Sequence, residues 1–403
     1  MSEEDLLARV HDLHDRIIAL DSHASVFPGG DRLRSCGATD RQVDLPKMRQ
    51  GRLDAAFFIA YAAQGPLTQD GYAEAERQAM ERFRGIHELV RTCSEEAALA
   101  RTPADVERIV EGGKVAVAIG MENGFMIGPD LTLLERYAEL GGAYLGLTHD
   151  GHNAIADAAV PREELGDAPS RHGGLSEFGE RVIAELNRLG IMVDVSHMSK
   201  AASLDAVRIS RTPVIASHSS MHALVPHARN MDDETLLALA ARGGVVQITA
   251  VHEFLKVDPP GAMEAFYGLL DEFGLETDAD ARTLPPDRRV EFERRSAEML
   301  EKWPLATVED LVDHIDHAVD LVGIDHVGIG SDFGGGGGLT GWAHAGEAAN
   351  VTAELLRRGY TEEEIRKLWG ENLLRVWMEV QRHAAARESA GAPAAAGPGT
   401  HGR

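Results

Sequence analysis

The segment EFGERVIAELNRLG (177–190), followed directly by IMVDVSHMS (191–199), contains the pattern that decides the fold. Apolar residues of the first part recur at helical spacing and Gly190 stands at its end, which predicts an amphipathic helix. The second part begins with a short apolar run and ends in polar residues that include His197, which predicts a buried strand. A helix that leads into such a strand is the repeating unit of a parallel α/β protein.

The same kind of apolar run, ending in polar or glycine-containing sequence, occurs eight times with helix-like segments between the runs. These runs are residues 17–24, 55–62, 114–123, 143–150, 191–199, 213–220, 244–251 and 326–333. Strands that are apolar on both faces are typical of parallel sheets covered by helices. Eight of them favour a closed (β/α)₈, TIM-type barrel of the α/β class over an open sheet.

The length of 403 residues and the 44% content of hydrophobic residues allow one large domain or two ordinary ones. We expect residues 1–383 to form a single barrel domain. Residues 253–305 are charged, contain prolines and are too long for an ordinary loop, so we expect them to form an insertion with its own helices between strands seven and eight. Residues 384–403 have the composition of a disordered C-terminal tail.

The charge and the cysteine content restrict the class of partner. The formal net charge of -25 repels nucleic acid and anionic lipid, and no apolar run is long enough to span a membrane. The N-terminus, MSEEDLLARVHDLHDR, is acidic and amphipathic, so we expect a cytoplasmic protein that acts on a small molecule. Two cysteines are too few for a disulfide framework or a thiolate metal cluster, which is consistent with a reducing compartment. Histidine and carboxylate would therefore hold any metal ion.

Potential metal ligands stand at the carboxyl ends of six of the eight predicted strands. They are His23, Glu122, His149, His197, His218 and Asp332. In a (β/α)₈ barrel these ends converge on one mouth, where catalytic groups lie. Imidazole and carboxylate ligands suit zinc, with manganese or iron as alternatives. The histidines on predicted helices are interpreted as structural instead; they are His11, His14, His87, His314, His317 and His383.

A carboxylate such as Glu122 can bridge two cations, with His23 on one side and the pair His197 and His218 on the other. Such a site generates a nucleophilic hydroxide near neutral pH and polarises a carbonyl, which is the chemistry of a hydrolase. The alternative interpretation of Glu122 is a capping or salt-bridged carboxylate at a strand end.

From about Asp21 to Val376 the chain resembles the renal (membrane) dipeptidases, which are zinc enzymes with a (β/α)₈ barrel. The resemblance is carried by VDLPKMRQG (43–51), GMENG (120–124), YLGLTHDGHNAIADA (144–158), VDVSHMS (193–199), PVIASHSS (213–220), ARNMDDE (228–234), HVGIGSDFGG (326–335) and ENLLRVW (371–377). It implies a homodimer that hydrolyses dipeptides or similar small amides with one or two zinc ions.

The resemblance also implies a role for each matching residue. His23 resembles the histidine of the first metal, Glu122 the bridging glutamate, and His197 with His218 the histidines of the second metal. A second set resembles the groups that handle the substrate. In that set His149 would polarise the scissile carbonyl, Arg229 would bind the substrate carboxylate, and Asp332 would move the proton of the attacking water to the leaving amine.

Simple chemistry supports the last two assignments. A guanidinium group binds a planar carboxylate with two parallel hydrogen bonds, and Asp332 is followed by glycines that allow close approach of a ligand. The alternatives are a surface salt bridge from Arg229 to Asp232 or Asp233, and a capping role for Asp332.

The sequence departs from the family pattern at position 25. The family has His-x-Asp at the first strand, with both side chains on the first metal, whereas this chain has His23-Ala24-Ser25. A serine hydroxyl is neutral near pH 7 and is a much weaker cation ligand than a carboxylate. The first metal is then bound weakly, or a single ion remains at the second position, or Asp21 takes over the role. The change also favours two further alternatives: a related enzyme, with two metal ions or only one, for a non-dipeptide small molecule of a biosynthetic pathway, and a catalytically silent binding protein.

Overall fold

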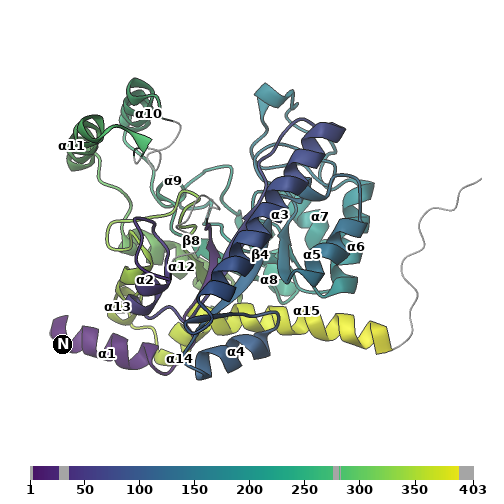
Figure 1. Cartoon of the computed structure of the whole chain (residues 1–403), viewed down its shortest axis with the longest axis horizontal. Coiled ribbons are helices and arrows are strands. Elements are labelled where there is room, and N and C mark those ends of the chain that lie inside the picture. The colour runs from purple at the N-terminus through teal and green to yellow at the C-terminus, as the bar shows by residue number, and fades with distance from the viewer. Residues whose placement is uncertain (1–2, 27–35, 276–280, 282, 390–403) are drawn as a thin grey trace, which may run out of the picture.

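Eight parallel strands surround the centre of the computed structural model, which describes residues 3–26, 36–275, 281 and 283–389 (Figure 1). In barrel order the strands are β1 (Leu20–Ala24), β2 (Ala55–Tyr61), β4 (Val115–Glu122), β5 (Gly142–Gly146), β6 (Met192–Asp194), β7 (Ile215–Ala216), β8 (Val245–Thr249) and β9 (Val327–Gly330). Each pairs in parallel with the next. The predicted (β/α)₈ architecture is confirmed, as a nearly closed barrel.

The seam between the first and last strands is held mainly by polar contacts at their carboxyl ends. Backbone hydrogen bonds run from Asp332 N to His23 O (2.9 Å) and from Ser25 N to Phe333 O (2.7 Å). The buried carboxylate of Asp21 accepts hydrogen bonds from the backbone N–H and the hydroxyl of Ser331. The seam therefore fixes the ends of β1 and β9 beside each other.

Helices cover the outside of the barrel. Those of the barrel proper are α1 (Glu3–His14), α2 (Leu45–Gln50), α3 (Gln69–Thr92), α4 (Pro103–Glu111), α5 (Thr132–Glu139), α6 (Glu177–Leu189), α7 (Lys200–Ile209), α8 (Asp233–Ala241), α12 (Val308–Val322), α13 (Ala349–Arg357), α14 (Glu362–Arg366) and α15 (Asn372–Ser389). The helix predicted first, α6, begins after Ser176, whose side chain accepts from Gly179 N, and ends at the left-handed Gly190.

One end of the barrel is closed by α15. Leu373 and Trp377 of this helix pack in one buried cluster with Leu20 and Phe57, which lie near the amino ends of β1 and β2. The rings of Phe57 and Trp377 are 5.4 Å apart. Because this end is filled with apolar side chains, the polar chemistry of the molecule is left to the carboxyl ends of the strands.

The insertion between β8 and β9 contains α9 (His252–Leu255), α10 (Ala262–Phe273) and α11 (Pro286–Lys302). The last two pack on each other through a small apolar cluster that includes Leu270, Phe273 and Phe292. Figure 1 shows α10 and α11 standing out from the barrel, with α9 beneath them. The insertion thus has helices of its own, at the position in the chain where the sequence predicts them.

Three features differ from the sequence expectations or were missed. A ninth strand, β3 (Ala97–Leu99), pairs with β4 beside the barrel path. Residues 384–389 of the predicted disordered tail are helical, because α15 continues to Ser389; residues 390–403 lie outside the described residues.

The third is a disulfide bond between the two cysteines. Cys36 precedes α2, and Cys93 is the residue after α3, so the bond joins positions 57 residues apart. The sequence, whose two cysteines are interpreted as too few for a disulfide framework, did not predict this bond.

Among the helices that the structure describes, none combines the length and the apolar character needed to cross a bilayer.

Candidate metal centre

Imidazole rings from three strands converge on the carboxylate of Glu122, the last residue of β4. Oε1 of Glu122 lies 3.3 Å from Nε2 of His197 and 3.5 Å from Nε2 of His218, and Oε2 lies 3.5 Å from Nε2 of His23. All four side chains are buried. The residues predicted to hold metal are therefore neighbours in space, although they are spread over almost two hundred positions.

The hydrogen bonds of His197 and His218 determine which ring nitrogen carries the proton. Nδ1 of His197 lies 3.1 Å from Oδ1 of Asp150, a carboxylate that only accepts, so Nδ1 is protonated. Nδ1 of His218 lies 2.8 Å from the hydroxyl of Ser217, whose own hydrogen is donated to Asp194 at 2.6 Å. This hydroxyl is left as an acceptor, and Nδ1 of His218 is protonated as well. In the neutral rings both Nε2 atoms then present a lone pair to the centre.

His23 is oriented in the same way by Tyr144 of β5. The tyrosine hydroxyl donates to the carbonyl oxygen of Ser22 (3.1 Å) and lies 2.9 Å from Nδ1 of His23, from which it accepts. Space for the tyrosine ring exists because residue 120 of β4 is glycine; a Cβ there would lie 2.2 Å from the ring. Nε2 of His23 is buried without a hydrogen-bond partner and points toward the carboxylates.

The donor set fits a metal cation. The Nε2 atoms of His197 and His218 are 3.0 Å apart, a distance at which two lone pairs repel unless a positive charge lies between them. Two groups of potential ligands have donor atoms within 4.8 Å of one another: His23, Glu122 and His218, and Glu122, His149 and His197. Three histidines and a carboxylate match the ligand preference of zinc.

The electrostatic field at His23 favours positive charge. Burial alone would lower the pKa of His23, but the adjacent Glu122 and Asp332 carboxylates raise it to about 8. Burial raises the pKa of Glu122, yet His23 and His197 outweigh this effect and hold it well below its usual value. A field that strengthens proton binding at His23 also strengthens the binding of a metal ion there.

His149 lies on the solvent side of the centre. It follows β5, stacks on the ring of His197 at 4.1 Å, and places Nε2 3.9 Å from Oε1 of Glu122. Tyr61, at the end of β2, contacts the other part of the ring, with centroids 5.0 Å apart. Burial lowers the pKa of His149, and the neighbouring His197 adds to the effect, so the ring is neutral at pH 7.

Asp332 also lies beside the centre, with Oδ1 3.8 Å from Nε2 of His23. It adopts a left-handed backbone (φ 55°), as does His197 (φ 67°), and such conformations in non-glycine residues are typical of functional sites. A Cβ at position 335 would lie 2.3 Å from the Asp332 carboxylate, so Gly335 makes room for it. Burial raises the pKa of Asp332 to about 6.

Arg229, in the loop between β7 and α8, is buried (6% exposed), and its Nε atom has no hydrogen-bond partner. The alternative of a surface salt bridge is not realised. Asp232 caps α8 and pairs with Lys200 (3.1 Å), and Asp233 pairs with His317 (2.9 Å). Within residues 3–26, 36–275, 281 and 283–389, no carboxylate forms an ion pair with this guanidinium group.

Ser25 lies just after β1, and only its backbone forms the seam with Phe333. The proposal that Asp21 replaces the missing carboxylate is wrong, because its oxygens bind Ser331 and the backbone N–H of His23. The carboxylates nearest to Nε2 of His23 are therefore those of Glu122 (3.5 Å) and Asp332 (3.8 Å).

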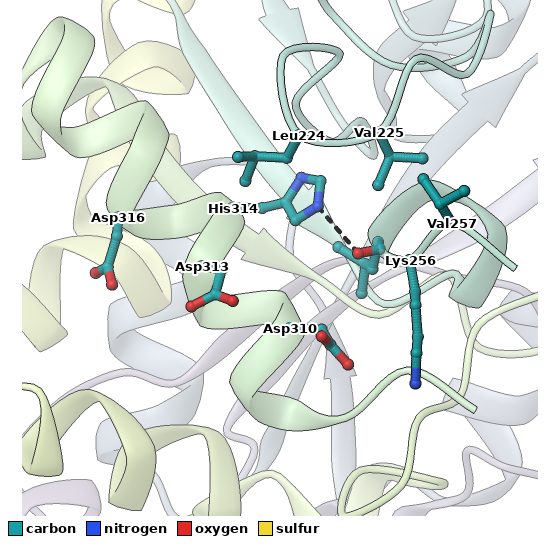
Figure 2. A pocket seen from close by; sticks show the side chains of 9 residues that line it. Leu224, Val225, Lys256, Val257, Asp310, Asp313, His314 and Asp316 are labelled. Carbon is teal, nitrogen blue, oxygen red and sulfur yellow. Dashed lines mark hydrogen bonds between the residues drawn. The ribbon is translucent and has the colours of Figure 1, made fainter. Parts of the chain in front are cut away.

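A separate cavity of about 380 Å³ is lined by none of these residues. Figure 2 shows Asp310, Asp313 and Asp316 of α12 on one side and Leu224 with Val225 on another. The three carboxylates are already engaged, in the cap of α12 or with Arg358. These three carboxylates are therefore not free to bind a ligand, and the ammonium group of Lys256, which also lines the cavity, donates to the carbonyl oxygen of Pro304 (3.2 Å).

The comparison with known proteins agrees with this geometry. The profile of the family Membrane dipeptidase (Peptidase family M19) matches residues 7–391. The chain belongs to the M19 family. As an M19 protein it is a metal-dependent hydrolase, and the resemblance read from its sequence is confirmed.

Relatives of this M19 protein include characterised and solved members. Dipeptidase aclJ of Aspergillus oryzae is 32% identical over 348 residues, which are 85% of this chain and 71% of the relative. The structure of the probable dipeptidase PvdM from Pseudomonas aeruginosa is 34% identical, with a TM-score of 0.83 and coverage of 95% of this chain and 100% of that one. A metallo peptidase from Rhodobacter sphaeroides, liganded with a phosphinate mimic of the dipeptide L-Ala-D-Ala, is 27% identical, with a TM-score of 0.71 and coverage of 90% and 99%.

The sequence did not identify the residues that orient the ligands of this M19 protein. Asp150, Ser217 and Tyr144 contact histidines predicted to bind metal, Asp194 accepts from Ser217, and no spacing rule connects these residues. Asp150 directly follows His149 and Ser217 precedes His218, so adjacency to a strand-end histidine was the available signal.

Proposed function

We propose that this M19 protein hydrolyses dipeptides or similar small amides, with one or two zinc ions held by His23, Glu122, His197 and His218. The observation that carries the proposal is the convergence of three Nε2 atoms on the carboxylate of Glu122, with each Nδ1 proton committed elsewhere. These residues would hold zinc, which would supply a Lewis acid for the scissile carbonyl and lower the pKa of a water molecule.

The substrate contacts follow from the charges at the mouth. The guanidinium of Arg229, whose Nε atom has no hydrogen-bond partner among the described residues, binds the terminal carboxylate of the substrate. Neutral His149 places an N–H donor beside the carbonyl oxygen as negative charge develops on it. Asp332, with its pKa raised to about 6 by burial, takes a proton from the attacking water and returns it to the leaving amine.

The test combines metal analysis with turnover. Protein freed of metal with a chelator is reloaded with zinc, cobalt or manganese and assayed against a broad dipeptide panel, including L-Ala-D-Ala. Bound metal and hydrolysis that both disappear in Glu122→Gln support the proposal. A protein that binds no metal and hydrolyses no dipeptide would refute it.

Ser25 favours a second candidate, an M19 enzyme with a single metal ion and a non-dipeptide small substrate. The serine removes one negative charge from the first metal position, and Asp21 does not replace it. The number of ions per chain separates the two candidates. Two ions together with efficient dipeptide hydrolysis would eliminate the second.

Two further proposals rest on family resemblance and on the sequence alone. We expect a homodimer, which sedimentation of the purified protein tests, and a single folding unit over residues 1–383, which limited proteolysis tests.

A further inference from the structure

The guanidinium of Arg229 lies against an aromatic ring. Its Cζ atom is 5.4 Å from the ring centroid of Phe254, and the imidazole of His227 packs against the same ring at 4.8 Å. The backbone N–H of Arg229 also donates to Nδ1 of His227 (3.2 Å). Since no carboxylate of the described chain pairs with Arg229, this ring is the neighbour that orients its charged group.

Phe254 does not belong to the barrel proper. It lies in α9, the first helix of the insertion, and its side chain is only partly exposed. The amide nitrogen of Asn230 donates to the carbonyl oxygens of Phe254 (2.8 Å) and Val225 (2.9 Å). Both partners only accept, so the orientation of this amide is fixed, and α9 is held against the loop that carries Arg229.

The other side of α9 is fixed as well. Nδ1 of His252 accepts from the backbone N–H of Ala306, where the chain returns from the insertion, and Nε2 lies 3.0 Å from Asp258. The two ends of the insertion are therefore joined at its base, and the position of Phe254 depends on that junction.

We propose that Phe254 is a positioning residue for Arg229, through which the base of the insertion sets the affinity for substrates with a free α-carboxylate. The inference rests on the proposed function, in which Arg229 binds that carboxylate. Loss of the ring leaves the guanidinium without its neighbour, so substrate binding weakens while the metal centre is unaffected.

The experiment compares a dipeptide with its C-terminal amide in the metal-loaded enzyme. Phe254→Leu removes the aromatic face and retains an apolar side chain, and Phe254→Tyr retains the face. Phe266→Leu is the matched control, because Phe266 is also half-buried in the insertion and contacts Tyr267 instead of Arg229. The melting temperature of each variant shows whether it is folded.

We expect Phe254→Leu to raise KM for the dipeptide about tenfold with little change in kcat, within the range of a partly desolvated cation–π contact. KM for the amide should stay unchanged, and Phe254→Tyr and Phe266→Leu should behave as wild type. An equal loss on dipeptide and amide, or no loss on either, would overturn the inference.

A variant of Arg229 shows whether a negative result contradicts only the role of Phe254 or also the proposed function. If Arg229→Met abolishes the preference of the enzyme for dipeptide over amide and Phe254→Leu does not reduce it, only the inference is wrong. If the wild type hydrolyses neither compound, or Arg229→Met keeps the preference, the proposed role of Arg229 is wrong and the inference falls with it.

Discussion

His197 and His218 point their Nε2 atoms at each other across 3.0 Å, and the protons of both rings lie on the opposite nitrogen. When both rings are neutral, neither can donate to the other, and a metal cation that accepts both lone pairs would remove their repulsion. We therefore expect a bound metal ion to stabilise the fold.

Metal removal should therefore destabilise the protein. A ligand at 100 times its dissociation constant adds about 2.7 kcal/mol to the free energy of unfolding. We expect chelation to lower the melting temperature and zinc to restore it, as measured by calorimetry. In His218→Asn, which lacks one of the facing lone pairs, chelation should lower the melting temperature much less. An unchanged melting temperature of the wild type on chelation would contradict the expectation.

Asp150→Asn should weaken metal binding without unfolding the protein. The carboxylate fixes the proton on Nδ1 of His197 and is 38% exposed, so its loss affects the ligand more than the core. Outer hydrogen-bond partners of metal-binding histidines are typically worth about 10- to 100-fold in affinity. Zinc titration with a competing chelator measures the change.

The matched control for this variant is Asp233→Asn. Asp233 pairs with His317 at 2.9 Å, a contact of the same kind between α8 and α12. The Asp233→Asn variant should leave zinc affinity unchanged. An equal loss of zinc affinity in both variants would show that the effect is not specific to the metal centre.

Ser25→Asp should strengthen the first metal position. A direct carboxylate ligand should matter at least as much as an outer partner, so we expect a gain on the order of tenfold in affinity for a second ion. Elemental analysis counts the ions, and dipeptide turnover is measured in parallel. Ser25→Asn, similar in shape but neutral, is the control; a gain with asparagine as well would exclude a charge effect.

Acid should destabilise the fold through His14 of α1. This buried ring contacts Thr352 at 2.7 Å, and burial lowers its pKa from 6.5 to about 4. Between these values the unfolded chain binds the proton and the folded chain does not. The stability that His14 contributes is therefore complete above pH 6.5 and is lost as the pH falls toward 4, by about 3 kcal/mol.

Urea unfolding at pH 7 and pH 4.5 checks this expectation. His14→Gln should lose less stability over that interval than wild type, and His11→Gln, at an exposed position of the same helix, should behave as wild type. Equal pH dependence in wild type and His14→Gln would contradict it.

Reduction of the Cys36–Cys93 bond should also destabilise the protein. The bond closes a loop of 57 residues, and the entropy of such a loop corresponds to about 4 kcal/mol in the unfolded state. Chemical denaturation with and without a reducing agent measures the difference. A Cys36→Ala/Cys93→Ala double variant should have the lower free energy of unfolding from the outset, and the reducing agent should not change it.

The barrel and the convergence of His23, His197 and His218 on Glu122 were predictable because they depend on local pattern. Each strand is a short apolar run, and the residue that follows it must reach the mouth in a parallel barrel. His218 does lie just beyond the carboxyl end of β7, although this strand is only two residues long. The change from apolar to polar residues in the sequence therefore located the strand end better than the short run of backbone pairing does.

What the sequence did not predict depends on contacts between distant segments. The hydroxyl of Tyr144 meets His23 across 121 positions, and the disulfide joins a residue of the first βα connection to the end of α3. The length of α15 was underestimated because alanine-rich sequence near Ala385 is compatible with either a tail or a helix, and packing decides between them.

The seam between β1 and β9 has a consequence for the order of assembly. The contacts of Asp21 with Ser331 and of Asp332 with His23 join the first and last strands of the sheet, β1 and β9. The same contacts bring His23 to Glu122. A folding intermediate with the cylinder still open lacks one ligand, so uptake of a full complement of metal during refolding would mark the moment at which the ring of strands is completed.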